Sequence, residues 1–191
     1  MGMNQAGFEV TGVDITNDHQ YPFQFIHRDV FDLDLDFIKG FDLMWSSPPC
    51  QVFTWGTRKD RKDKFPDLVD KTRQLLLKTG KPFIIENVVG APLRKDLVLC
   101  GEMFGLNVIR HRIFEIHGFT VLQPPHIKHK PPKDKTHSAY CCVSGHGGDS
   151  YTFRLEDWQK AMDIYHITKK EHLTQAIPPA YSKYIASYFT E

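Results

Sequence analysis

The chain has 191 residues, of which 41% are hydrophobic and 25% charged, and its formal net charge is +1. This length fits one domain with a buried core, and no apolar run is long enough to span a bilayer. The amino terminus lacks the basic and apolar segments of a secretory signal peptide, and the four cysteines do not form the pattern of a disulfide framework. We therefore expect a single cytoplasmic domain over residues 1–191, in which affinity for nucleic acid would come from local basic patches.

The first two predicted strands each lead to an acidic side chain. A short strand after Gly7 ends at Asp14, and the strand around Phe25 is followed by Asp29. A carboxylate at the tip of an early strand can accept hydrogen bonds from both hydroxyls of a ribose. Alternatively, Asp14 only begins a turn, because Thr16 and further polar residues follow it.

The strand predicted over 41–46 ends on Pro48, Pro49 and Cys50. Consecutive prolines remove backbone donors and fix φ, so the strand must stop and Cys50 lies on a stiff turn. In an open α/β sheet, the carboxyl ends of the strands are where ligands bind. Positive potential from the basic segment that follows would favour the nucleophilic thiolate, whereas a buried cysteine without chemical function is the alternative. The basic residues of that segment are Arg58, Lys59, Arg61, Lys62 and Lys64.

Two further strands carry charged candidates. The apolar strand 83–85 delivers Glu86 to its carboxyl end, at the same sheet edge as the cysteine turn, and we favour a functional role for this carboxylate. A strand predicted over 108–116 has an alternating pattern, which places Arg110 and Arg112 on one face. Two guanidinium groups on one face of an apolar strand need anions or carbonyls to bind, which favours a binding role. Alternatively, the arginines protect an edge strand from pairing with other chains by their charge.

The rest of the chain predicts helices around a long loop. Helical spacing is present over 67–78, 157–162, 168–175 and 181–189, and the segment 123–150 has the composition of a loop. Strands that alternate with helices predict an α/β fold with a doubly wound, mostly parallel sheet. We expect no metal site in the loop, because adjacent cysteines do not match the usual spacing of zinc ligands. The residues considered for such a site are His137, Cys141, Cys142 and His146.

In this order, the motifs resemble those of the DNA (cytosine-5)-methyltransferase family, in the compact form found in bacteriophages. The resemblance covers nearly the whole chain, and the ordered set is far more specific than any single motif. The matching stretches are Ala6-Gly7-Phe8-Glu9-Val10, Gly12-Val13-Asp14, Asp29, Ser47-Pro48-Pro49-Cys50-Gln51, Glu86-Asn87-Val88, Arg110 with Arg112, and Gln175-Ala176-Ile177-Pro178-Pro179. The resemblance implies a Rossmann-like class I methyltransferase fold that depends on S-adenosylmethionine.

The resemblance also implies that a methyl group passes from S-adenosyl-L-methionine to C5 of a cytosine in DNA. Cys50 would attack C6 of a base flipped out of the duplex, which makes C5 nucleophilic. Glu86 would hydrogen-bond or protonate N3, and Arg112, accompanied by Arg110, would bind the carbonyl oxygen of the base. The implied cofactor-binding residues are Asp14, Ile15, Asp29, Val30 and Pro48. The implied nucleic-acid-binding residues are Gln51, Arg58, Lys59, Arg61, Lys62 and Asn87. The expected setting is a monomer in the cytoplasm of a bacterial or phage-infected cell, as in restriction-modification.

The sequence departs from the family pattern at three places. Family members open with a strand and a glycine-rich loop before the stretch at 6–8, and this sequence begins within or after that loop. The missing strand would lie centrally and leave two apolar strand edges unpaired, so either the true start lies upstream or the enzyme is damaged. Residues 115–157 form a small variable region in place of a target-recognition domain, and Gln175 stands where the family usually has Asn. The alternatives are an impaired homologue that binds nucleic acid or a partner, and a related C5 modification that acts on RNA or adds another group.

Overall fold

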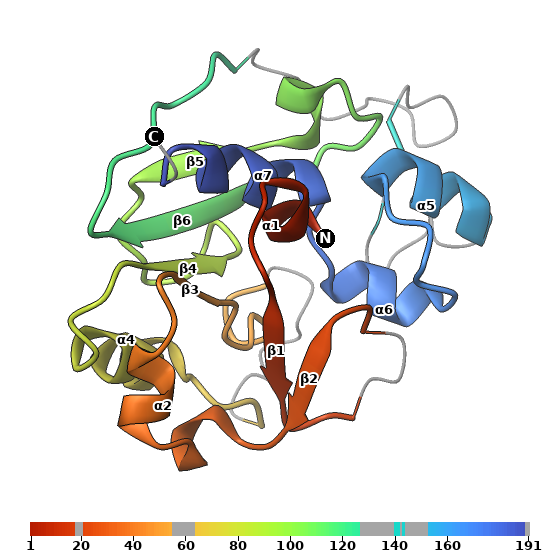
Figure 1. The fold of residues 1–191 in the computed structure, drawn as a ribbon. Coiled ribbons are helices and arrows are strands. Elements are labelled where there is room, and N and C mark those ends of the chain that lie inside the picture. Colours follow the sequence, from red (N-terminus) through yellow and green to blue (C-terminus); the bar gives the residue numbers. More distant parts are fainter. Residues whose placement is uncertain (18–20, 55–63, 127–139, 142, 144–152, 190–191) are drawn as a thin grey trace. The chain divides into compact units, whose positions relative to one another are not determined.

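The computed structural model describes residues 1–17, 21–54, 64–126, 140–141, 143 and 153–189. Helices and strands are interspersed along the chain as far as His117, and the described residues after it are helical or irregular, which confirms the predicted α/β class (Figure 1). No helix in these ranges is long and apolar enough to cross a membrane. The chain forms two compact units. The first unit consists of Met1–Glu9, Leu99–His111 and Gln123–Glu191, and the second consists of Val10–Val98 and Arg112–Leu122.

A two-stranded parallel sheet forms from the start of the second unit. Strand β1 (Thr11–Asp14) pairs with β2 (Gln24–His27), in a register that places Asp14 opposite His27. The ring of Tyr21 packs so closely on β1 that a Cβ at Gly12 would lie 2.5 Å from it. A larger residue at this position would make the Tyr21 ring shift, and the register places the carboxyl ends of the two strands side by side.

The larger sheet has the strand order β3-β4-β6-β5. Its strands are β3 (Met44–Ser46), β4 (Phe83–Asn87), β6 (Arg112–His117) and β5 (Leu97–Leu99). β3 and β4 run parallel, whereas β4 and β6 run antiparallel. The larger sheet is therefore mixed, with β6 as its antiparallel strand next to β4.

Two further features of the strands bear on the prediction, of which the start of β6 differs from it. β1 and β3 each stand at the end of a separate sheet, and no strand in the described ranges pairs with their outer edges, which are the two edges that the sequence predicts to be unpaired. The strand predicted over 108–116 begins only at Arg112, since Val108 instead forms an isolated bridge with Cys141. Arg110 consequently lies outside the strand, and the alternation that was to place it on one face with Arg112 does not apply.

Helices of the second unit pack on its strands through a continuous core. These helices are the short 3₁₀ turn η1 (Val30–Asp32), α2 (Leu35–Lys39) and α4 (Val69–Leu77). α4 buries Val69, Thr72 and Leu76, whose spacing defines one face of the helix. Val69 and Leu76 join Phe83 and Ile85 of β4 in the core, so α4 covers the strand that carries Glu86.

The first unit is mainly helical. It contains α1 (Gly2–Gln5), the 3₁₀ turn η2 (Gly101–Phe104), α5 (Leu155–Met162), α6 (Lys170–Gln175) and α7 (Pro179–Ser187). α1 lies against α7 (Figure 1). A second core gathers Val108, Trp158, Met162 and Leu173, and it fastens α5 and α6 to the segment that precedes β6.

Candidate active site

Glu86 and Arg112 meet at one edge of the larger sheet. Glu86 lies near the carboxyl end of β4, and Arg112 opens β6; because the two strands are antiparallel, these ends are neighbours. The Arg112 Nε atom lies 2.9 Å from Glu86 Oε1, and the side chains are only 13% and 7% exposed. The structure thus brings together the acid and the guanidinium that the sequence predicts for the site, as a largely buried ion pair.

The turn that carries Cys50 is attached to the end of β4. β3 runs parallel to β4, so both strands end at the same edge of the sheet. The Asn87 side-chain amide donates a 2.9 Å hydrogen bond to the Pro48 carbonyl. The Cys50 carbonyl accepts hydrogen bonds from the Phe53 amide at 3.0 Å and from the Thr54 hydroxyl at 2.8 Å. The half-buried thiol is therefore presented by a fixed turn, which Asn87 ties to the position directly after Glu86.

The segment after β4 packs closely on the cysteine turn. A Cβ at Gly90 would lie 2.9 Å from the carbonyl oxygen of Phe53, so glycine allows the two backbones to approach. The Phe53 ring also packs on the core of the second unit. Beside Cys50, the side-chain oxygen Oε1 of Gln51 is buried without a hydrogen-bond partner among the described residues. This oxygen is an acceptor that a bound ligand could use.

Arg110 lies in the first unit and binds backbone carbonyls there. Its NH1 group donates to the Val143 carbonyl at 2.9 Å, and its NH2 group donates to the Thr174 carbonyl at 2.6 Å. The Tyr181 hydroxyl in turn donates to the Arg110 carbonyl at 2.7 Å. The residue is buried, and this geometry fastens three segments of the first unit to one another.

The acids predicted to bind the cofactor both lie at the carboxyl end of the smaller sheet. Asp14 Oδ1 accepts a 2.7 Å hydrogen bond from the Thr16 amide, and Asp29 Oδ1 accepts one of 2.9 Å from the Phe31 amide. Both residues thus also make the local turn contacts that the alternative interpretation of Asp14 predicts. Their exposed side chains, and those of Ile15 and Val30, belong to this sheet, whereas Pro48 is buried at the end of the larger one.

Part of the predicted nucleic-acid surface is described by the structure. Gln51 and Asn87 lie beside the cysteine turn, as given above. The other predicted contacts lie outside the described residues; these are Arg58, Lys59, Arg61 and Lys62.

Sequence reasoning missed a buried carboxylate at the centre of β6. Glu115 is 3% exposed, and Arg73 of α4 binds both of its oxygens, at 2.8 and 2.9 Å. The Arg94 amide donates to Glu115 at 3.0 Å, and the His117 ring lies 2.9 Å from it. Burial raises the pKa of Glu115, but the hydrogen bonds from Arg73, His117 and the Arg94 amide lower it more, so that it falls from 4.5 to about 2. The signal in the sequence was a lone glutamate on an otherwise apolar strand.

A comparison with solved structures finds a likeness to Spodoptera frugiperda DNMT2, in the crystal structure of a triple mutant, at 22% identity and a TM-score of 0.45. The match covers 70% of this chain and 53% of that protein, so the chain spans about half of its length. No model of a protein family matches the sequence, and no curated protein matches it. The function must therefore be inferred from the residues of the site.

Proposed function

We propose that the chain transfers a methyl group from S-adenosyl-L-methionine to C5 of cytosine in DNA, through a covalent bond between Cys50 and C6 of a flipped-out base. The observation that carries this proposal is the 2.9 Å contact between Glu86 and Arg112 at the sheet edge where the Cys50 turn emerges. This contact joins the acid and the guanidinium that the reaction needs. The hydrogen bond from Asn87 to the Pro48 carbonyl holds the turn that carries Cys50 at the end of the same strand.

The ion pair suits the hydrogen-bonding edge of a cytosine. The Arg112 guanidinium can donate to the carbonyl oxygen O2, and a protonated Glu86 can donate to N3. When the base enters, the Glu86 carboxylate would take up a proton and turn from Arg112 to N3, and the negative charge that develops on the ring would then balance the Arg112 guanidinium. A cytosine inside a duplex cannot reach this edge, which is why the proposal requires base flipping.

The reaction follows from these contacts. The Cys50 sulfur adds to C6, and the electrons of the C5–C6 double bond move into the ring, where Glu86 and Arg112 stabilise the charge at N3 and O2. S-Adenosylmethionine, when bound, supplies an electrophilic methyl group to C5. A base then removes the C5 proton, the double bond reforms, and the C6–S bond breaks to return Cys50 as a thiolate.

The cofactor would lie along the carboxyl ends of the strands. Asp14 and Asp29 stand beyond the parallel strands β1 and β2, where two exposed carboxylates suit the ribose hydroxyls and the adenine amino group. Ile15 and Val30 would contact the adenosine, and Pro48 would lie beside the methyl donor. We further propose that the chain acts as a monomer in the cytoplasm of a bacterial or phage-infected cell.

Methyl transfer from radiolabelled S-adenosylmethionine to matched DNA and RNA substrates tests the proposal. We expect label in DNA, and a denaturation-resistant complex with DNA that contains 5-fluorocytosine, because fluorine at C5 prevents release of the thiol. Cys50→Ser should abolish both signals while it leaves calorimetric binding of S-adenosylmethionine unchanged. If only RNA becomes labelled, the substrate is RNA and not DNA. If S-adenosylmethionine does not bind, the chain is better explained as a protein that only binds nucleic acid. Full methyl transfer by Cys50→Ser would refute the covalent scheme.

A further inference from the structure

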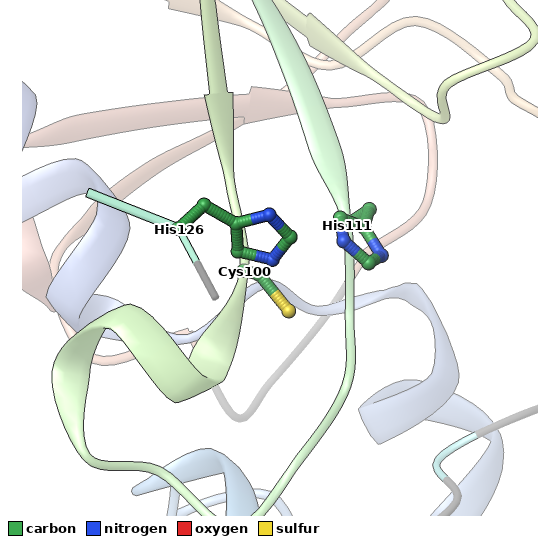
Figure 2. A group of neighbouring side chains, drawn as sticks. All are labelled: Cys100, His111 and His126. Carbon is green, nitrogen blue, oxygen red and sulfur yellow. The ribbon is translucent and has the colours of Figure 1, made fainter. Parts of the chain in front are cut away.

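Three residues distant in the sequence gather their ligand atoms in the first unit. The Cys100 sulfur and a ring nitrogen from each of His111 and His126 all lie within 4.8 Å of one another. Figure 2 shows the sulfur between the two imidazole rings. The ring centroids are 5.1 Å apart and the ring planes are nearly perpendicular, at 86°.

The backbone holds two of these residues in place. Cys100 directly follows β5 and His111 directly precedes β6, and these two strands are neighbours in the larger sheet. The Met103 amide donates to the Cys100 carbonyl at 3.1 Å, which closes the turn after the cysteine. A Cβ at Gly101 would lie 2.4 Å from the Val108 carbonyl oxygen, so only glycine lets the two ends of this connection approach. His126 comes from a separate segment, and the gathering of all three residues is a product of the fold.

The donor set selects a class of metal. One thiol and two imidazoles, without a carboxylate, suit zinc and similar transition metals and not the hard cations magnesium and calcium. A zinc ion with sulfur at about 2.3 Å and nitrogen at about 2.0 Å holds tetrahedral ligand atoms about 3.3–3.7 Å apart. Small side-chain rotations would bring the three atoms from their present separation to these values. Cys100 is buried, His111 is half-buried and His126 is exposed, so the cluster opens to solvent on the His126 side.

We propose that Cys100, His111 and His126 bind one zinc ion, with a solvent molecule in the fourth position. The site goes beyond the proposed methyl transfer and shares no residue with it. The ion would fasten the segment at His126 to the turn between β5 and β6, and it would displace the thiol proton. The sequence alone could not indicate this site, because no pair of its ligands has the short spacing of a zinc motif.

Metal content and cobalt spectroscopy of the purified full chain, after removal of any affinity tag, test the proposal. We expect one zinc ion per chain, and, after exchange with cobalt, a thiolate-to-cobalt charge-transfer band in the near ultraviolet. Cys100→Ser should remove this band and Cys50→Ser should retain it. His126→Ala should weaken zinc binding at least about tenfold, and the exposed His166→Ala serves as the matched control with unchanged affinity. Added zinc should raise the thermal midpoint of the metal-free chain and leave that of His126→Ala unchanged.

Several outcomes would overturn the zinc site. One is a chain that holds no stoichiometric metal and shows no thiolate band with excess cobalt. A second outcome is that His126→Ala binds zinc as tightly as the unchanged chain. A third is that Cys50→Ser loses the thiolate-to-cobalt band. The metal titration of the unchanged chain does not depend on the stability of Cys100→Ser, and circular dichroism of His126→Ala, which should match that of the unchanged chain, checks that this exposed substitution leaves the fold intact. None of these results depends on methyl transfer, so the zinc site and the proposed reaction fail or succeed separately.

Discussion

Replacement of Glu115 with glutamine removes the charge that joins α4 to β6. Arg73 binds both carboxylate oxygens and is itself only 18% exposed, so the substitution leaves a largely buried guanidinium without its main counterion. The glutamine amide also presents hydrogens to the donors of Arg73 and of the Arg94 backbone. We therefore expect a large loss in the free energy of unfolding.

The magnitude follows from the lowered pKa of Glu115. The fall from 4.5 to about 2 is a stabilisation of about 3 kcal/mol for the ionised form, and screening by solvent reduces this to about 2 kcal/mol. Because the pKa is depressed in the folded state, the contribution is fully present above about pH 4.5 and is lost as the pH falls toward 2. The stability difference between the unchanged chain and Glu115→Gln should therefore be constant near neutral pH and narrow below about pH 4.5.

Urea unfolding followed by tryptophan fluorescence, at several pH values, measures this difference. Asp70→Asn is the matched control, because Asp70 contacts the same Arg73 guanidinium from a side chain that is 87% exposed. Its removal should cost less than about 1 kcal/mol at any pH. If Glu115→Gln and Asp70→Asn lower the free energy of unfolding by the same amount, the burial of Glu115 does not set the strength of its ion pair. A difference for Glu115→Gln that stays constant down to pH 2 would refute the assigned ionisation.

The remaining predictions concern the site and Arg110. Cys50→Ala should abolish methyl transfer while it leaves the urea unfolding curve unchanged, because the thiol is half-buried and the turn is held by its backbone. Glu86→Gln should lower kcat by about 10²-fold or more, with methyl transfer as the readout. Gly90→Ala should lower both activity and thermal midpoint, since the added Cβ would meet the Phe53 carbonyl at 2.9 Å. Arg110→Lys should lower the free energy of unfolding by about 2 kcal/mol through its lost hydrogen bonds to carbonyls, and a loss of activity without this destabilisation would instead indicate a direct catalytic role.

The position of Glu86 and of the Cys50 turn at one sheet edge could be predicted from local rules, whereas the contact of Glu86 with Arg112 was implied by the family resemblance. Glu86 is the first polar side chain after the apolar pattern Phe-Ile-Ile, and it lies one residue before the end of β4. The neighbouring strand that leads to Cys50 is parallel to it, so both reach the same edge. Periodicity and the rule for sheet edges were sufficient for Glu86 and Cys50, whereas the meeting with Arg112 was implied only by the family resemblance.

Other features depend on contacts that no local pattern encodes. The burial of Glu115 requires Arg73, which lies on a helix 42 residues earlier in the chain. The cluster of Cys100 with His126 requires a turn and a third segment to meet.

Residues 110 to 112 show how a single misplaced strand boundary changes a functional interpretation. A strand across these positions would place both arginines on one face and the histidine on the other. Instead, Arg110 binds carbonyls of the first unit, His111 faces Cys100, and Arg112 opens β6 and pairs with Glu86. The chain passes from the first unit to the second at the bond between His111 and Arg112. The start of β6 at Arg112, and not at Val108, therefore decides which of the three side chains reaches Glu86.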